Sequence, residues 1–145
     1  MEDSKPIHRL SNQICFPLYA ASRKIIQAYR EPLDKLGLTY PQYLVLMLLW
    51  EKDGQLVSEI GHMLYLDSGT LTPLLKRMQA ANLVTRERDT SDERKVIISL
   101  TAKGKSLEEA GKQISADMIC LLQDMQPNNM RALKNQLNDL INLLN

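Results

Sequence analysis

The sequence predicts a mainly α-helical fold that carries one small β-hairpin. Two long segments near the ends of the chain repeat apolar residues every three or four positions, which is the period of one face of an α-helix. Between them, 83–88 and 95–100 are rich in β-branched residues and flank a polar turn. The 145 residues suit a single domain, and 44% of them are apolar, which is enough to bury a core.

The first third of the chain predicts two helices. Apolar residues recur at helical spacing from Ile7 to Ile25, and Pro17 is expected to kink the helix that they define. Residues 39–42 read Thr-Tyr-Pro-Gln, which is a Thr-x-x-Gln capping box with proline in the first turn. This box should start a mostly buried helix that runs from Tyr43 to Glu51.

The middle of the chain predicts a helix-turn-helix motif followed by the hairpin. A short helix is expected over Val57–Leu64 and a turn over 65–67. Ser68 should then cap a second helix over Gly69–Ala81. Two helices joined by a turn of about three or four residues match this motif. The two strands of the hairpin meet at a turn over 89–94.

The last third of the chain predicts two more helices and, with the first helix, a dimer interface. Thr101 should cap a helix that continues to Pro127, and a final helix carries apolar residues from Met130 to Leu144. Both end segments of the chain present apolar stripes, and no further layer of chain remains to cover them. A helical homodimer is therefore the economical arrangement.

Charge and cysteine content exclude several classes of protein. The net charge of +1, from 18 Lys+Arg and 17 Asp+Glu, argues against a diffuse basic coat but allows a local basic patch. Two cysteines are too few for a disulfide scaffold. The longest apolar run, 43–50, is far shorter than the roughly 20 residues of a membrane span, and Glu2 and Asp3 do not suit a secretory signal. We expect a cytoplasmic protein without a membrane partner.

The second helix of the motif and the hairpin carry the candidate nucleic-acid contacts. No acid lies between Ser68 and Gln79, and hydroxyls near a helix start followed by cations suit base edges and phosphates in a major groove. A cation on a β-turn can enter a narrow minor groove, and Asp92 could hold the Arg94 guanidinium in a bidentate pair. The plain alternative is an exposed polar helix face and a solvated turn. The candidate DNA-binding residues are Ser68, Thr70, Thr72, Lys76, Arg77, Arg86, Asp92, Arg94 and Lys95.

The two cysteines are the candidate reactive groups. Cys15 lies beside the apolar stripe of its helix, and Cys120 has largely polar neighbours at helical spacing. Neither position suits simple core filling, although an inert thiol remains the alternative because reactivity depends on surroundings that a sequence does not show. With only two histidines and no phosphate-binding loop or metal-ligand motif, the sequence predicts no catalytic site, metal site or cofactor.

Four stretches, 38–43, 66–78, 92–94 and 100–104, together resemble the MarR family of winged-helix repressors, and more narrowly its organic hydroperoxide resistance regulators. The resemblance covers nearly the whole chain. It implies a homodimer joined through 1–37 and 101–145, with 38–100 as a winged helix-turn-helix lobe that binds a palindromic operator in double-stranded DNA. In this arrangement the helix 69–81 enters the major groove, and Arg94 enters the minor groove with Asp92 as its support.

The resemblance also implies a redox switch. Cys15 would be the peroxide-sensing thiol, Tyr29 and Tyr40 would hydrogen-bond it across the dimer, and Tyr19 would lie nearby. Cys120 places the chain with the members that have a second cysteine. An organic hydroperoxide would oxidise Cys15 to a sulfenic acid, which condenses with Cys120 of the partner subunit and releases the operator. Two alternatives stay open: release by a reversibly bound phenolic ligand, and a thiol peroxidase that uses Cys15 catalytically.

Overall fold

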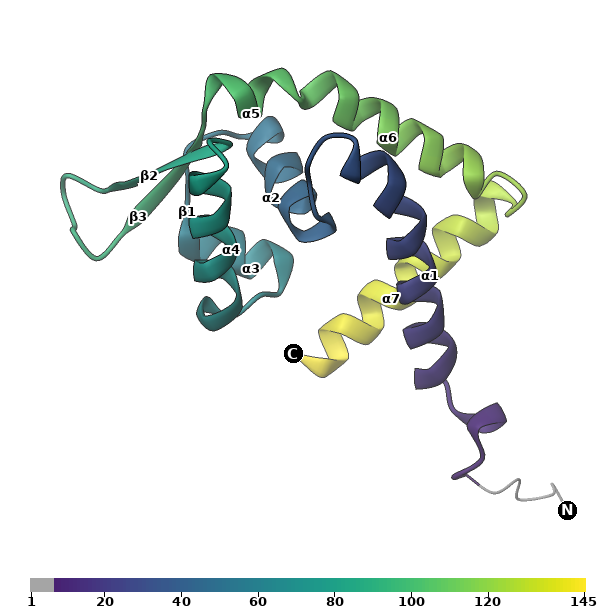
Figure 1. The fold of residues 1–145 in the computed structure, drawn as a ribbon. Helices are drawn as coiled ribbons and strands as arrows, with labels where there is room; N and C mark the ends of the chain where they lie inside the picture. The colour runs from purple at the N-terminus through teal and green to yellow at the C-terminus, as the bar shows by residue number, and fades with distance from the viewer. Residues whose placement is uncertain (1–6) are drawn as a thin grey trace, which may run out of the picture.

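The computed structural model describes residues 7–145 and has the predicted fold class, mainly α-helical with a small β-sheet (Figure 1). Residues 1–6, which include Glu2 and Asp3 of the segment predicted not to be a secretory signal, lie outside the described residues. In chain order the elements are a 3₁₀ turn (Leu10–Asn12), α1 (Cys15–Asp34), α2 (Tyr40–Glu51), β1 (Gln55–Leu56), α3 (Val57–Leu64), α4 (Ser68–Ala80), β2 (Val84–Arg88), β3 (Val96–Leu100), α5 (Ala102–Ser106), α6 (Glu108–Leu121) and α7 (Pro127–Leu144).

The first long helix begins later than its apolar pattern predicts. The prediction of a helix from Ile7 is wrong, because a 3₁₀ turn precedes α1 and the helix starts at Cys15. The predicted kink at Pro17 is also wrong. Pro17 is the third residue of α1, where a backbone N–H has no partner within the helix, so its absence breaks no hydrogen bond. Pro17 therefore lies in the first turn and does not interrupt the helix.

The start of α2 confirms the predicted capping box. The Thr39 hydroxyl accepts a hydrogen bond from the Gln42 backbone N–H (3.5 Å), and the Gln42 side chain accepts one from the Thr39 N–H (3.0 Å). The helix begins at Tyr40, three residues earlier than expected, because the box includes its first turn in the helix. Tyr43, Leu46 and Leu49 are fully buried, so α2 lies at the centre of the core.

The helix-turn-helix is present, but its second helix has a different cap. Tyr65 adopts a left-handed conformation (φ 54°) and ends α3 as predicted. The prediction that Ser68 caps α4 is wrong, because the Asp67 carboxylate accepts the Thr70 N–H at 2.7 Å and Ser68 is already the first helical residue. The inner side of α4 is buried as expected, through Leu71, Leu74, Leu75 and Met78.

The predicted hairpin is confirmed and gains a third strand. β2 and β3 pair antiparallel from Val84 opposite Leu100 to Arg88 opposite Val96. The two-residue strand β1 pairs with the other edge of β3, which gives the order β1-β3-β2. Two residues are too few to show an alternating pattern, so β1 could not be predicted from the sequence. The hairpin projects well beyond the helices (Figure 1).

The single helix predicted from Thr101 to Pro127 is wrong, because the chain breaks it at Leu107 into α5 and α6 and ends α6 at Leu121. The Thr101 cap itself is confirmed, since its hydroxyl accepts the Gly104 N–H at 3.0 Å. The same hydroxyl lies 2.6 Å from the Asn82 carbonyl oxygen, to which it can donate. These contacts hold α5 against the segment before β2, so the chain changes direction at Leu107, between α5 and α6.

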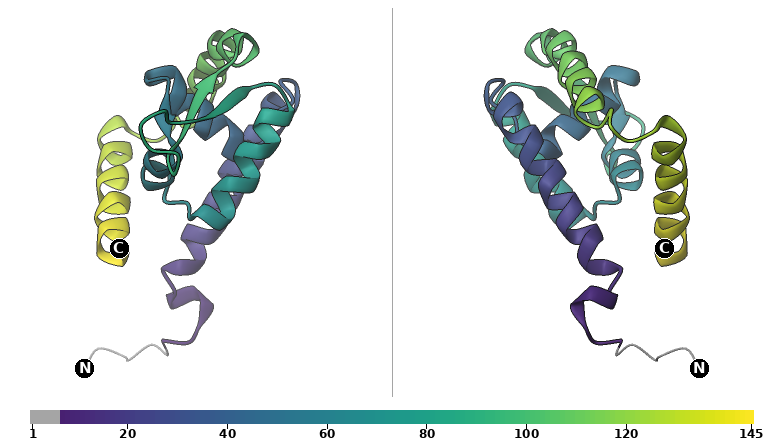
Figure 2. Two further views of the ribbon diagram at one scale, coloured as in Figure 1. Left: turned by 90° about the vertical axis from the view of Figure 1, so that its left-hand side faces the viewer. Right: turned by 90° about the vertical axis from the view of Figure 1, so that its right-hand side faces the viewer.

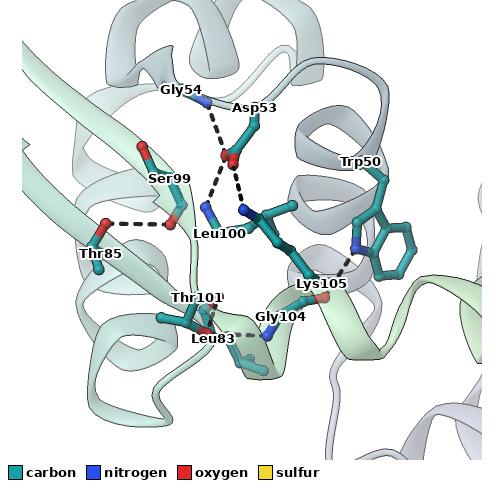
Figure 3. Close-up of polar contacts among 10 residues, drawn as sticks. All are labelled: Trp50, Asp53, Gly54, Leu83, Thr85, Ser99, Leu100, Thr101, Gly104 and Lys105. Carbon is teal, nitrogen blue, oxygen red and sulfur yellow. Dashed lines mark hydrogen bonds and ion pairs between the residues drawn. The ribbon is translucent and has the colours of Figure 1, made fainter.

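A polar cluster ties the end of α2 to the base of the sheet and to α5 (Figure 3). The Asp53 carboxylate accepts hydrogen bonds from the Gly54 N–H (2.9 Å) and from the Leu100 N–H (2.8 Å). The Trp50 indole N–H donates to the Gly104 carbonyl at 3.0 Å. The base of the hairpin is therefore fixed to two helices, whereas its tip extends freely.

The terminal helices lie largely outside the core. α7 buries no residue, and it stands apart from the lobe in both views of Figure 2. Large apolar side chains are exposed on α1, on the end of α6 and on α7, including Phe16 (45% exposed), Ile119 (70%) and Leu143 (81%). Leu33 near the end of α1 and Ile114 in the middle of α6 are exceptions that pack into the core.

Candidate functional site

A hollow between α3, α4 and the hairpin gathers several of the predicted DNA-binding residues. Ser68 and Thr72 of α4 line one side of it, and Arg86, Arg94 and Lys95 of the hairpin line the other. Hydroxyl donors thus face three cations across one concave surface. The other predicted residues of α4, Thr70, Lys76 and Arg77, do not line this hollow; they are exposed on the remaining outer surface of the helix.

Arg86 is the least exposed cation of this surface. Its side chain is half-buried, and its Nε is buried without a hydrogen-bond partner among the residues that the structure describes. A buried donor that lacks a partner is costly, and it gains most from an acceptor that enters from outside. A phosphate or base oxygen is such an acceptor.

The hairpin tip holds Arg94 in an extended position. Its Nε donates to Asp92 Oδ1 at 3.2 Å, and its backbone N–H donates to the same oxygen at 3.1 Å. The predicted bidentate pair is therefore wrong, because the guanidinium contacts one carboxylate oxygen through Nε alone and the second bond comes from the backbone. The side chain of Arg94 is 91% exposed and that of Asp92 only 29%. The acid is part of the turn, and the guanidinium projects from it.

Asp89 stabilises the same turn and was not among the predicted residues. Its carboxylate accepts hydrogen bonds from the Ser91 hydroxyl (2.6 Å) and from the Ser91 N–H (2.7 Å). The bond from the hydroxyl is the main reason that the pKa of Asp89 lies below its ordinary value. An Asp followed two residues later by Ser is a common turn signal, which could have identified this residue from the sequence.

Three tyrosines pack together where α1 meets α2. The ring centroids of Tyr29 and Tyr40 are 4.9 Å apart, and Tyr43 lies 5.8 Å and 6.4 Å from them. Burial, followed by the neighbouring phenols, raises the pKa of Tyr29 and of Tyr40 above the ordinary value, so both remain protonated donors at neutral pH. The structure thus brings together two of the three predicted pocket tyrosines and adds Tyr43.

Tyr19 and Cys15 lie away from this cluster. Tyr19 is exposed and contacts Arg23, whose guanidinium lies 5.4 Å from the ring centroid and 3.5 Å from the hydroxyl. Cys15 is the exposed first residue of α1, fourteen residues before Tyr29. At 1.5 Å per residue, the helix separates them by about 21 Å. Within one chain, Cys15 therefore cannot reach the hydroxyl of Tyr29.

Cys120 is the second exposed thiol. It lies one residue before the end of α6, between the exposed side chains of Ile119 and Leu121. The structure places both cysteines on the terminal helices that carry uncovered apolar side chains, and neither has a disulfide partner within the chain.

Within residues 7–145, each helix is too short or too polar to span a bilayer. The same residues contain no group of three or more histidine, cysteine, aspartate or glutamate side chains that could hold a metal ion.

Comparison with known proteins identifies the family. A family model described as transcriptional regulator SarA/Rot matches residues 27–110. The organic hydroperoxide resistance transcriptional regulator of Bacillus subtilis is 46% identical over 144 residues, which cover 99% of this chain and 97% of that one. The relatives found in these comparisons are regulators of transcription, and none indicates an enzyme family.

Solved structures give the same result for the fold. Reduced AbfR bound to DNA superposes with a TM-score of 0.82 at 40% identity, covering 94% of each chain. Disulfide-formed AbfR gives 0.66 at 41% identity, covering 92% of this chain and 93% of that one. A MarR transcriptional regulator from Methanosarcina mazei gives 0.76 at 25% identity over 89% and 94%. The chain belongs to the MarR family of winged-helix transcriptional regulators, alongside the organic hydroperoxide resistance regulators.

Proposed function

We propose that two copies of this chain form a transcriptional repressor that releases its operator when an organic hydroperoxide oxidises Cys15. The observation that carries the proposal is the placement of Cys15 and the tyrosine pair. Both lie on or beside α1, yet about 21 Å of helix separates them in one chain. An antiparallel second copy would bring Cys15 of one chain to Tyr29 and Tyr40 of the other.

The uncovered apolar surface supports this dimer. α7 has no buried residue, and the apolar side chains of α1 and of the end of α6 are exposed in the single chain. Exposed apolar patches of this extent usually mark an interface between proteins. We assign dimerisation to 1–37 and 101–145 and DNA binding to 38–100, with Leu33 and Ile114 anchoring the terminal helices to the lobe.

The DNA-binding assignment rests on the hollow between α4 and the hairpin. In a winged helix of this kind, α4 enters the major groove and presents Ser68, Thr70, Thr72, Lys76 and Arg77. The hairpin then follows the backbone to the minor groove, where Arg94 projects from its turn. A dimer with two such lobes would read a palindromic operator. The closer match to reduced, DNA-bound AbfR than to its disulfide form supports a DNA-binding conformation here.

The proposed chemistry begins with the Cys15 thiolate. Its sulfur attacks the terminal peroxide oxygen, the O–O bond breaks, and the alkoxide leaves with its electron pair and takes a proton from water. Sulfur is thereby oxidised to a sulfenic acid, and the hydroperoxide is reduced to an alcohol. The thiolate of Cys120 of the partner subunit then attacks this sulfur, an S–S bond forms, and hydroxide leaves. The disulfide would rotate the two lobes away from successive grooves.

One observation favours a second candidate function. An open groove along α1 and the start of α2 is lined by apolar side chains together with Tyr19, Arg23, Lys24, Arg30 and Tyr40. Cations beside aromatic rings suit a small phenolic acid, which would release the operator without any thiol chemistry. The two candidates differ in whether release requires Cys15.

Replacement of Arg94 by alanine is expected to weaken operator binding about tenfold. An arginine that reaches a groove contributes about 1–3 kcal/mol, and each 1.4 kcal/mol is a factor of ten. Titration of labelled operator at several salt concentrations should also give a shallower salt dependence for this variant. Lys52→Ala, which removes an exposed cation that does not line the hollow, is the matched control and should bind as wild type does. Equal affinity for Arg94→Ala would reject the assignment of the hairpin tip to DNA.

Replacement of Cys120 by serine should abolish the covalent dimer without preventing oxidation of Cys15. Wild-type protein treated with one equivalent of cumene hydroperoxide is expected to run as a dimer on a non-reducing gel. The Cys120→Ser protein should run as a monomer and still lose its Cys15 thiol, because the first step does not use Cys120. A covalent dimer that persists in this variant would show that Cys120 is not the resolving residue.

A further inference from the structure

Tyr43 occupies the centre of an aromatic group that reaches from α1 to the end of α2. Its side chain is only 1% exposed, and its ring lies 5.8 Å from Tyr29, 6.4 Å from Tyr40 and 6.2 Å from Trp50. Tyr29 and Tyr40 are half-buried at the edge of this group. The two proposed sensor tyrosines therefore rest on a third that is fully covered by protein.

The hydroxyl of Tyr43 is fixed by α6. It donates to the Gly111 carbonyl at 2.9 Å and lies 2.5 Å from the Ser115 hydroxyl. A phenol has only one proton, and in Tyr43 it goes to the Gly111 carbonyl. Ser115 is therefore the donor in the second bond. Both partners belong to one turn of α6, more than sixty residues away in the chain.

The close approach of α6 depends on the absence of a side chain at Gly111. A Cβ there would lie 2.5 Å from two ring carbons of Trp50 and 3.4 Å from a ring carbon of Tyr43. No side chain larger than hydrogen fits between α6 and these rings. The Tyr43 ring is thus held from both ends, by the aromatic group around it and by α6 at its hydroxyl.

The hydroxyls of the two other tyrosines differ from this one. Among residues 7–145, the hydroxyls of Tyr29 and Tyr40 have no hydrogen-bond partner. Two phenols without an acceptor are therefore available as donors to a group from outside the chain, such as the thiolate of a second copy. The third phenol is fully used inside the fold.

We propose that Tyr43 is the positioning residue of the peroxide sensor: tethered to Gly111 and Ser115 of α6, its ring fixes Tyr29 and Tyr40 where they can donate to Cys15 of the partner subunit. This inference rests on the proposed redox function and adds a residue that does not itself touch the thiol. The tether also joins the sensor tyrosines to the helix that carries Cys120.

The test measures the rate at which cumene hydroperoxide consumes the Cys15 thiol, in a Cys120→Ser background that leaves one thiol in each chain. Tyr43→Phe keeps the ring and removes the tether, and it should slow the reaction about fivefold, the effect of one typical hydrogen bond. Ser115→Ala leaves the bond to the Gly111 carbonyl and should slow it less. Tyr65→Phe changes a tyrosine outside the group and is the matched control. Each variant should bind the operator as its parent does when reduced.

Non-additivity separates positioning from a general loss of stability. If Tyr43 acts through its neighbours, Tyr43→Phe should have no further effect on the rate in a chain that already carries Tyr29→Phe and Tyr40→Phe. A Tyr43→Phe protein that reacts as fast as its parent would overturn the proposal. The proposal would also be overturned if adding Tyr43→Phe to the Tyr29→Phe, Tyr40→Phe protein slowed the reaction by the same factor as Tyr43→Phe does alone. A Tyr29→Phe, Tyr40→Phe protein that reacts at the full rate would instead reject the sensor role of those two tyrosines, which belongs to the proposed function.

Discussion

Operator DNA bound by a Cys15→Ser protein is expected to stay bound when an organic hydroperoxide is added. A serine hydroxyl is not ionised at neutral pH and does not displace an alkoxide from a peroxide, so the first step of the switch is lost entirely. The substitution changes one exposed atom at the start of α1, far from the hollow between α4 and the hairpin. Affinity of the untreated protein for the operator should therefore remain within about twofold of wild type, a difference below 0.5 kcal/mol.

The measurement is operator binding before and after treatment with cumene hydroperoxide, for wild type, Cys15→Ser and Cys120→Ser. Wild type should release the DNA and recover with a thiol reductant, since a disulfide is reversible. Release from the Cys15→Ser protein by the hydroperoxide would end the sensing role of Cys15. Release from the same variant by a phenolic acid alone would instead support the reversible ligand. The Cys120→Ser protein separates oxidation of Cys15 from formation of the disulfide.

Elements whose signals are local could be predicted from the sequence. The capping box at 39–42 needs only two side chains three residues apart, and it is present as expected. The hairpin follows from two β-branched stretches around a polar turn, and its register extends over the whole of β2 and β3. Ser68 shows the limit of such signals. Both Asp67 and Ser68 can cap a helix, and the choice depends on which of the two adopts the extended conformation. The residue types do not show this, and in the structure it is Asp67.

In the candidate site too, contacts between residues close in the sequence could be predicted, and contacts between distant residues could not. The contact between Asp92 and Arg94 joins residues two apart, so the sequence predicts it, although not its use of a single oxygen. The role of Tyr43 depends on Gly111 and Ser115, which lie 68 and 72 residues further along the chain. Nothing near Tyr43 in the sequence indicates that α6 passes over it. Likewise, helical periodicity alone does not show the break at Leu107. The Thr101 hydroxyl contacts the segment before β2, and the Gly104 carbonyl accepts from the Trp50 indole N–H, and both are tertiary contacts.

Replacement of Gly104 by alanine should destabilise the fold strongly. A Cβ on Gly104 would lie 2.2 Å from the Leu83 carbonyl oxygen and 3.1 Å from a methyl carbon of Leu100. The first of these is a backbone atom that already accepts a hydrogen bond from the Thr101 N–H, so it cannot turn away as a side chain would. α5 must then move off the base of the hairpin, which also pulls the Gly104 carbonyl from the Trp50 indole (Figure 3).

Overpacking of this kind costs about 3 kcal/mol, and for a chain of this size it should lower Tm by about 10 °C. Thermal unfolding should be compared at one protein concentration, because Tm depends on concentration if the chain dimerises. Gly69→Ala is the matched control. Its Cβ would meet only a side-chain oxygen, that of Asp67 at 3.3 Å, and alanine favours a helix by about 1 kcal/mol over glycine, so Tm should not fall. An unchanged Tm for Gly104→Ala would mean that α5 can leave the hairpin freely, and the rigid base on which the position of Arg94 depends would be absent.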